Sequence, residues 1–191
     1  MIALIGNRPA IQVGRHQVHQ YDTRWLGDAL RRAATAAESE NFPFLDEIRL
    51  GIEEYLETRC KLQVIPLPTL FDRVRRMLRK VGCGLIAENL EPVAPPVTLS
   101  LDQIAREIGD GFELAFYEQL RTEISDLRQQ GVEQLYFDGL REAVRVLRRC
   151  DGGWNDACQQ SLEEIRAFLM RQHREFRFGL SEIEIDSWLP E

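Results

Sequence analysis

The sequence predicts an α+β fold divided into two domains, residues 1–92 and residues 93–191. Three observations lead to this prediction. Prolines at positions 92, 95 and 96 interrupt the chain, strand patterns and then helical patterns precede them, and strands alternate with helices after them. Because proline restricts the backbone to extended conformations and excludes a continuing helix, we place the domain boundary there. Each half, roughly 90–100 residues long, is large enough for its own core.

The N-terminal domain begins with short strands. Residues 1–6 and 10–14 form apolar, β-prone runs on either side of a turn at Asn7-Arg8-Pro9, and residues 17–21 form a candidate third strand. Apolar residues then recur at helical spacing in four segments: residues 23–37, 43–60, 68–81 and 84–90. The pattern predicts a small hairpin or three-stranded sheet against four helices.

The C-terminal domain has a different pattern. Strands are predicted at residues 97–101, 112–117 and 132–137, and helices at residues 102–108, 118–131, 140–149 and 155–173. This order favours a small mixed or parallel sheet covered by helices. Residues 112–130 also fit one long helix, because four apolar side chains share a helical face: Phe116, Leu120, Ile124 and Leu127. The acidic tail, residues 175–191, alternates apolar and charged residues, and no role is assigned to it.

Composition excludes several classes of protein. With 44% hydrophobic and 29% charged residues, the chain matches ordinary folded soluble proteins. No apolar run approaches the roughly 18 residues that span a bilayer, and the short apolar start lacks the basic region of a secretory signal. We therefore expect no membrane partner and a cytoplasmic location.

The net charge of −7 arises mostly after residue 92. An acidic chain is poorly suited to the phosphate backbone, so nucleic-acid binding is not expected. One segment is locally basic: Arg73, Arg75, Arg76, Arg79 and Lys80. These residues surround apolar positions of a predicted helix. They form either its solvated face or a patch for an anion or an acidic partner.

The cysteine and histidine spacings do not suggest a metal site. Cys60, Cys83, Cys150 and Cys158 contain no CxxC pair, which in a reducing compartment favours free, mostly buried thiols over disulfides or zinc ligands. His16 and His19, three residues apart, point to opposite faces of a strand. We expect no metal ion and no cofactor.

Part of the N-terminal half resembles a known module. Tyr21-Asp22 leads into a helix with apolar residues at fixed spacing, and "LFDRVRRMLRKVGCGLIAENL" has the apolar spacing of two helices separated by glycine. Over about residues 10–91 this arrangement resembles the ATP-cone, the regulatory nucleotide-binding domain of ribonucleotide reductases and their transcriptional repressor. The matching positions of the first helix are Leu26, Ala29, Leu30 and Ala33. The resemblance implies a β-hairpin above four helices and pairing with a second copy.

The chain departs from that family at the ligand. The family carries a Lys-Arg-Asp-Gly-type turn, and here the corresponding positions are Val13, Gly14, Arg15 and His16. A triphosphate requires several amides and cations around its oxygens, so we expect no ATP binding. The polar groups that remain are Arg8, Arg15 and His16. They are the candidate ligand-binding residues for a small anion, and the alternative is that Arg15 and His16 are turn residues facing water.

Three classes of function remain. The chain is a non-catalytic regulatory or protein-interaction protein, a small-molecule or anion sensor with an altered ligand, or an enzyme with its site in the C-terminal domain. No phosphate loop, GxGxxG or HExxH motif is present, and we assign no catalytic residue. The first class is our expectation, with a second copy or another protein as partner.

Overall fold

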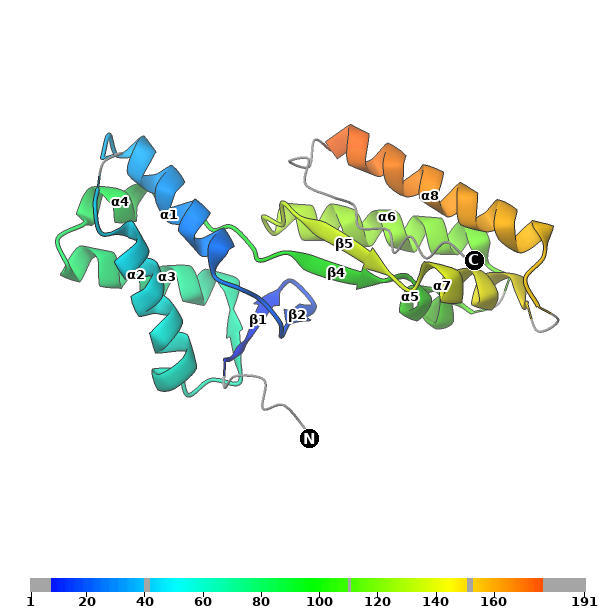
Figure 1. Cartoon of the computed structure of the whole chain (residues 1–191), viewed down its shortest axis with the longest axis horizontal. Helices are drawn as coiled ribbons and strands as arrows, with labels where there is room; N and C mark the ends of the chain where they lie inside the picture. The colour runs from blue at the N-terminus through cyan, green and yellow to red at the C-terminus, as the bar shows by residue number, and fades with distance from the viewer. Residues whose placement is uncertain (1–7, 40–41, 110, 151–152, 177–191) are drawn as a thin grey trace, which may run out of the picture. The chain divides into compact units, whose positions relative to one another are not determined.

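The computed structural model describes residues 8–39, 42–109, 111–150 and 153–176, and it divides into two compact units. Unit 1 comprises Met1–Pro95 and Gln130–Val132, and unit 2 comprises Pro96–Gln129 and Glu133–Glu191. Both contain helices and a small sheet, which confirms the α+β class (Figure 1). The predicted strand at residues 1–6 lies outside the described residues.

The sheet of unit 1 has the order β2-β1-β3. Strand β1 (Ala10–Val13) pairs antiparallel with β2 (His16–Val18) and parallel with β3 (Val64–Pro66). Ile11 and Ile65, partners in adjacent strands, are fully buried. The sequence did not predict β3, because three residues that end in proline carry too little periodicity to identify a strand.

Four predicted helices of unit 1 are present: α1 (Arg24–Ala36), α2 (Leu45–Glu54), α3 (Leu67–Lys80) and α4 (Gly84–Asn89). Helix α2 continues into η1 (Tyr55–Arg59), a single turn of π-helix. Helix α1 packs against α2 and α4, and α4 packs against α3. Their shared core includes fully buried side chains: Leu26, Leu30, Leu56, Leu70, Phe71 and Leu78.

The sheet of unit 2 is a parallel pair. Strands β4 (Val97–Ser100) and β5 (Leu135–Asp138) run side by side with Val97 opposite Leu135. Between them the chain forms α5 (Leu101–Ile108) and α6 (Glu113–Gln129), and after them α7 (Leu140–Arg148) and α8 (Asp156–Phe176). Helix α5 packs against α6 and α7, and α7 packs against α8.

The predicted strand at residues 112–117 is wrong, because this segment belongs to helix α6. A half-buried strand would have buried Phe112, Leu114 and Phe116 together. Instead Phe112 is 63% exposed and Leu114 is 83% exposed, whereas Phe116 is fully buried. Phe116, Leu120, Ile124 and Leu127 are all buried on one helical face, as the alternative reading required.

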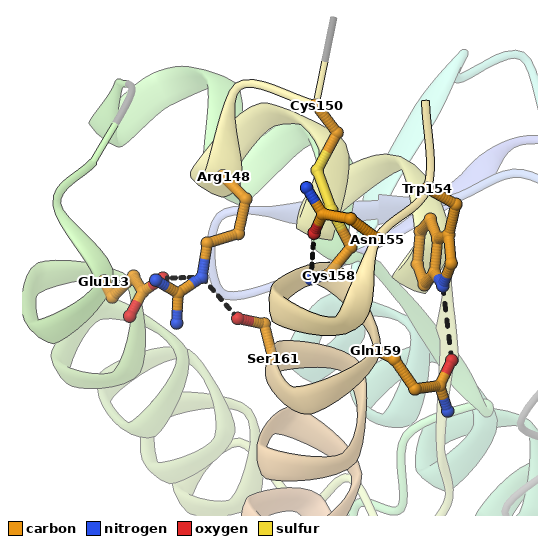
Figure 2. The surroundings of a disulfide bond; sticks show 8 residues. All are labelled: Glu113, Arg148, Cys150, Trp154, Asn155, Cys158, Gln159 and Ser161. Carbon is orange, nitrogen blue, oxygen red and sulfur yellow. Dashed lines mark hydrogen bonds and ion pairs between the residues drawn. A yellow bond between two sulfur atoms is a disulfide. The ribbon is translucent and has the colours of Figure 1, made fainter. Parts of the chain in front are cut away.

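The prediction of four free thiols is wrong for two of them. Cys150 and Cys158 form a disulfide across eight positions of sequence, with their Cα atoms 7.2 Å apart (Figure 2). Cys60 and Cys83 are free. The two cysteines flank the connection between α7 and α8, and these helices pack against each other, which brings the two sulfur atoms together. The glycine-rich connection indicates a turn, but it does not show that the cysteines bond across it.

Candidate functional site

The turn of the β1–β2 hairpin carries two of the predicted ligand-binding residues. Val13 and His16 are the last paired residues, so Gly14 and Arg15 form the tip. Gly14 has a φ of 57°, a left-handed conformation that suits glycine in a two-residue hairpin. Arg15 is exposed and His16 is half-buried. The hairpin therefore presents Arg15 outward at its tip.

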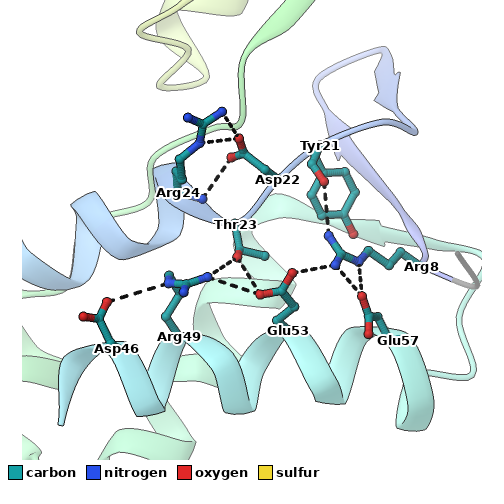
Figure 3. A network of polar contacts seen from close by, with 9 residues as sticks. All are labelled: Arg8, Tyr21, Asp22, Thr23, Arg24, Asp46, Arg49, Glu53 and Glu57. Atoms are coloured by element: carbon teal, nitrogen blue, oxygen red, sulfur yellow. Dashed lines mark hydrogen bonds and ion pairs between the residues drawn. The ribbon is translucent and has the colours of Figure 1, made fainter.

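Arg8, the third predicted residue, is held by acidic side chains of its own unit. Its Nε donates to Glu57 Oε1 at 2.8 Å, its Nη2 lies 2.5 Å from Glu53 Oε1, and its Nη1 donates to the Tyr21 carbonyl at 3.2 Å (Figure 3). Although burial opposes the charge of Arg8, the bonds to Glu57 and Glu53 outweigh it and raise the Arg8 pKa. Arg8 therefore joins the segment before the sheet to α2 and η1, and its guanidinium is engaged by groups of its own unit.

Glu53 extends this contact into a network that sequence reasoning missed. Its Oε2 accepts from Thr23 Oγ1 at 3.1 Å and from Arg49 Nη1 at 3.2 Å, and Arg49 Nη1 also donates to Thr23 Oγ1 at 2.8 Å (Figure 3). Thr23 directly precedes α1 and is only 2% exposed. Glu53 thus connects the start of α1 to the residue that precedes the sheet. The only sequence signal is the spacing of Arg49, Glu53 and Glu57 by four on one helix.

Tyr21 completes the network at the exit of the hairpin. Its hydroxyl donates to the Pro9 carbonyl at 2.7 Å, which fixes the segment after β2 to the segment before β1. Burial raises the pKa of Tyr21 to about 12, and the nearby Arg8 opposes this only in part. Tyr21 is therefore neutral at physiological pH and acts as a hydrogen-bond donor.

A second feature of unit 1 is a recess of about 720 Å³ between α2–η1 and α3. Its floor is apolar, and its rim carries four cations and one carboxylate. The floor residues are Ile52, Leu70, Val74 and Met77. The charged rim residues are Arg59, Arg73, Arg76, Lys80 and Glu54. A volume of this size falls within the roughly 300–1,000 Å³ of small-molecule sites. Three of the rim cations belong to the basic segment that the sequence identified.

Helix packing explains why this recess exists. Helix α2 packs against α1, α1 against α4, and α4 against α3, whereas α2 and α3 approach each other less closely than these pairs. Gly51 adds to the space, since a Cβ built there meets no atom within 4 Å. Arg73 spans the gap and donates a hydrogen bond to the Tyr55 hydroxyl. The recess therefore lies where α2–η1 and α3 are separated, and the Arg73–Tyr55 hydrogen bond links its two sides.

Unit 2 contains a polar cluster beside the disulfide. Arg148 at the end of α7 contacts Glu113 Oε1 at 2.7 Å and donates to Ser161 Oγ at 2.5 Å, so it joins α7 to α6 and α8 (Figure 2). The Arg141 guanidinium lies 4.7 Å from the centre of the Trp154 ring, a cation–π distance. These contacts connect α7 to α6, to α8 and to the segment that precedes α8, and we assign them a structural role.

No protein-family model, curated protein or solved structure matches the chain. Within the described ranges, no group of three or more histidine, cysteine, aspartate and glutamate side chains is arranged to hold a metal ion. Among the helices that the structure describes, none has the length and apolar character needed to span a membrane.

Proposed function

We propose that this chain is a non-catalytic regulatory or protein-interaction protein, built on a cone-like N-terminal unit that has lost its nucleotide-gripping residues. The observation that carries the proposal is the pairing of Arg8 with Glu53 and Glu57. A nucleotide site needs cations that are available to phosphate oxygens. Here Arg8, the cation that precedes the hairpin, is compensated by two carboxylates. The hairpin has thereby become part of the framework of unit 1.

Nucleotide titration tests this proposal. ATP and dATP at millimolar concentration should give no saturable heat in calorimetry and no thermal shift, because the basic turn of the family is replaced by Val13, Gly14, Arg15 and His16. A ligand that binds the native state must raise its stability. A saturable shift of several degrees with either nucleotide would contradict the loss of the nucleotide site.

The proposal includes a protein partner, which is a second copy of the chain or another protein. Several large apolar side chains of unit 1 are exposed on its helices and on the segments that flank them: Phe44, Leu50, Val81 and Leu85. Val81 and Leu85, at 60% and 64% exposed, lie four positions apart around the α3–α4 connection. We propose these two neighbouring side chains as part of the surface that a partner covers.

A cytoplasmic location also belongs to the proposal, and the Cys150–Cys158 bond provides its test. Cytosolic thiols are kept reduced, so Cys150, which is half-buried, should react with a maleimide in intact cells. Cys60, which is free, serves as the internal reference. Labelling of Cys60 without labelling of Cys150 would place the protein in an oxidising compartment.

A second candidate function is that of an anion sensor. The recess between α2 and α3 favours it, because an apolar floor beneath a cationic rim suits a charged ligand. Such a sensor would use the helical layer of unit 1 in place of the hairpin.

A further inference from the structure

We propose that the recess between α2–η1 and α3 binds a small amphipathic anion, meaning an apolar body joined to one carboxylate, sulfonate or phosphate group. This inference gives the sensor candidate a ligand class and a site. It is independent of the hairpin, so it can fail while the regulatory proposal stands, and the nucleotide titration separates the two.

The charge of the rim selects an anion. Arg73, Arg76 and Lys80 project from one side of α3, and positions 73 and 80 lie about 10 Å apart along the helix. Arg73 donates to the Tyr55 hydroxyl, and Arg76 Nε donates to the Asp72 carbonyl of its own helix. Across the residues that the structure describes, no acidic side chain forms an ion pair with these three cations. The rim therefore has a positive excess on a chain with a net charge of −7.

The remaining rim charges do not cancel this excess. Arg59 lies 4.0 Å from Glu54, and both side chains are largely exposed, at 75% and 67%. An exposed pair at that distance is weak, so Arg59 can turn toward an incoming anion at little cost. Arginine is well suited to this task because its guanidinium donates two parallel hydrogen bonds to a carboxylate or phosphate.

The floor selects an apolar body. The apolar lining residues are Leu70, Val74 and Met77 on α3 and Ile52 on α2; Met77 is half-buried, and the other three are at most 3% exposed. The ligand must suit both surfaces. A purely apolar molecule would take water away from the rim charges without replacing it, and a bare inorganic ion would gain nothing from the apolar floor. A recess of about 720 Å³ is sized for a small molecule. We therefore favour a small molecule over an acidic helical peptide.

A matched pair of fluorescent probes tests this proposal on the full-length chain. 8-Anilinonaphthalene-1-sulfonate has an apolar aromatic body and one sulfonate, and N-phenyl-1-naphthylamine has the same body without the charge. We expect saturable binding of the sulfonate and at least tenfold weaker binding of the uncharged probe. Inorganic phosphate at millimolar concentration should not displace the sulfonate. Equal affinity for the two probes, or no saturable binding of the sulfonate, would overturn the proposal.

Variants locate the binding to the recess. Arg76→Ala combined with Lys80→Ala should raise the dissociation constant of the sulfonate at least tenfold. Arg79→Ala, which removes a cation of the same helix outside the recess, should change it less than twofold. If the double variant binds as wild type does, the probe binds elsewhere and the proposed site is wrong.

A steric pair provides a second, independent check. Gly51→Phe places a ring in the open space beside Gly51 and should abolish binding, whereas Gly51→Ala should preserve it. Circular dichroism melting of each variant confirms folding before titration. Should Gly51→Phe fail to fold, the double cation variant still decides the outcome. An acidic helical peptide that binds this recess while the sulfonate does not would replace the small molecule as occupant and overturn the proposal.

Discussion

At the scale of single residues, a partly buried polar network connects the segment before the sheet of unit 1 to its helices. Arg8, Glu53 and Thr23 come from three separate parts of the chain, and together they fix the sheet to the first two helices. The side chains of Arg8 and Glu53 are only 21% and 24% exposed, so water screens their attraction less than it screens surface pairs. Charge-assisted hydrogen bonds in such settings contribute more than neutral ones.

Substitution at Glu53 tests this interpretation. Glu53→Gln keeps the shape but removes the charge shared by Arg8 and Arg49, and it should lower the free energy of unfolding by about 1–2 kcal/mol in urea denaturation. Its neighbour Glu54 is the control, because that residue is exposed and has only a long contact with Arg59. Glu54→Gln should cost less than about 0.5 kcal/mol. Equal losses for the two variants would show that the network adds no stability.

The raised pKa of Tyr21 predicts that the free energy of unfolding depends on pH in the alkaline range. Its pKa is raised from 10.0 to about 12 in the native state, so between those values the folded protein holds a proton that the unfolded chain releases. Stability from this group is therefore complete below pH 10 and falls as pH rises toward 12. Comparing urea unfolding of wild type and Tyr21→Phe at pH 9 and pH 11 isolates the effect, because the variant lacks this titration.

The loss between the two pH values should be smaller in Tyr21→Phe than in wild type. Tyr117, whose pKa burial also raises, is present in both proteins, so its contribution cancels in the comparison. Identical losses in the two proteins would mean that Tyr21 ionises equally easily in both states.

At the scale of secondary-structure elements, the α7–α8 connection depends on a covalent bond. The Cys150–Cys158 disulfide closes a short loop, and loop-closure entropy for a separation of eight residues corresponds to about 2–3 kcal/mol. Cys150→Ser should lower the free energy of unfolding by this amount without touching Cys158, which is fully buried. Cys60→Ser, at a free half-buried position, is the matched control.

A reducing agent sharpens this test. With a trialkylphosphine reductant, the free energy of unfolding of wild type should fall to that of Cys150→Ser, and that of the variant should not change. A wild-type protein that is equally stable with and without the reductant would contradict a stabilising bond.

The elements also show what the sequence can and cannot predict. The helices of unit 1 were predicted because each repeats its apolar residues over several turns, as Leu26, Leu30 and Ala33 do in α1. For the segment of α6, the sequence fitted either a strand followed by a helix or one long helix. Phe112 and Leu114 alternate with polar or small residues near its start, as residues of a strand do. Strand β3 exists only through pairing with β1, a partner more than fifty positions away. Such long-range pairing leaves no local pattern.

In the candidate sites, too, local patterns were visible in the sequence and long-range contacts were not. The cations of α3 were visible as a basic segment, because they are local in sequence. Whether they form a solvated face or a rim depends on the distance between α2 and α3, which only tertiary packing sets. Arg8 was recognised as a polar residue near the hairpin, but its partners Glu53 and Glu57 lie more than forty positions away. The Cys150–Cys158 bond likewise depends on the packing of α7 against α8, which only the tertiary structure shows.

At the scale of the whole molecule, we expect self-association through the α3–α4 connection. Val81 and Leu85 are large, apolar and exposed in unit 1, and burial against a second copy would remove them from water. Light scattering at micromolar concentrations should give the mass of an oligomer, and Val81→Glu with Leu85→Glu should return it to a monomer. Leu114→Glu, at the most exposed of these apolar positions but in unit 2, should leave the oligomer intact.

A strict monomer across that concentration range would contradict this expectation. An oligomer that survives the double substitution would place the interface on another surface, with Phe44 and Leu50 as the next residues to change.

The return of Gln130–Val132 to unit 1 has a consequence for how the protein can be cut. The Ala94 amide donates to the Gly131 carbonyl at 3.1 Å, and Val132 is buried, so a segment from beyond the proline linker is part of the first unit. A chain cut at a protease site inserted between Pro95 and Pro96 should therefore leave two fragments that elute together from a gel-filtration column under native conditions. A gene truncated at the same point would encode a first unit with a missing piece. Any boundary chosen for recombinant expression of unit 1 has to supply those three residues, by fusion or in trans.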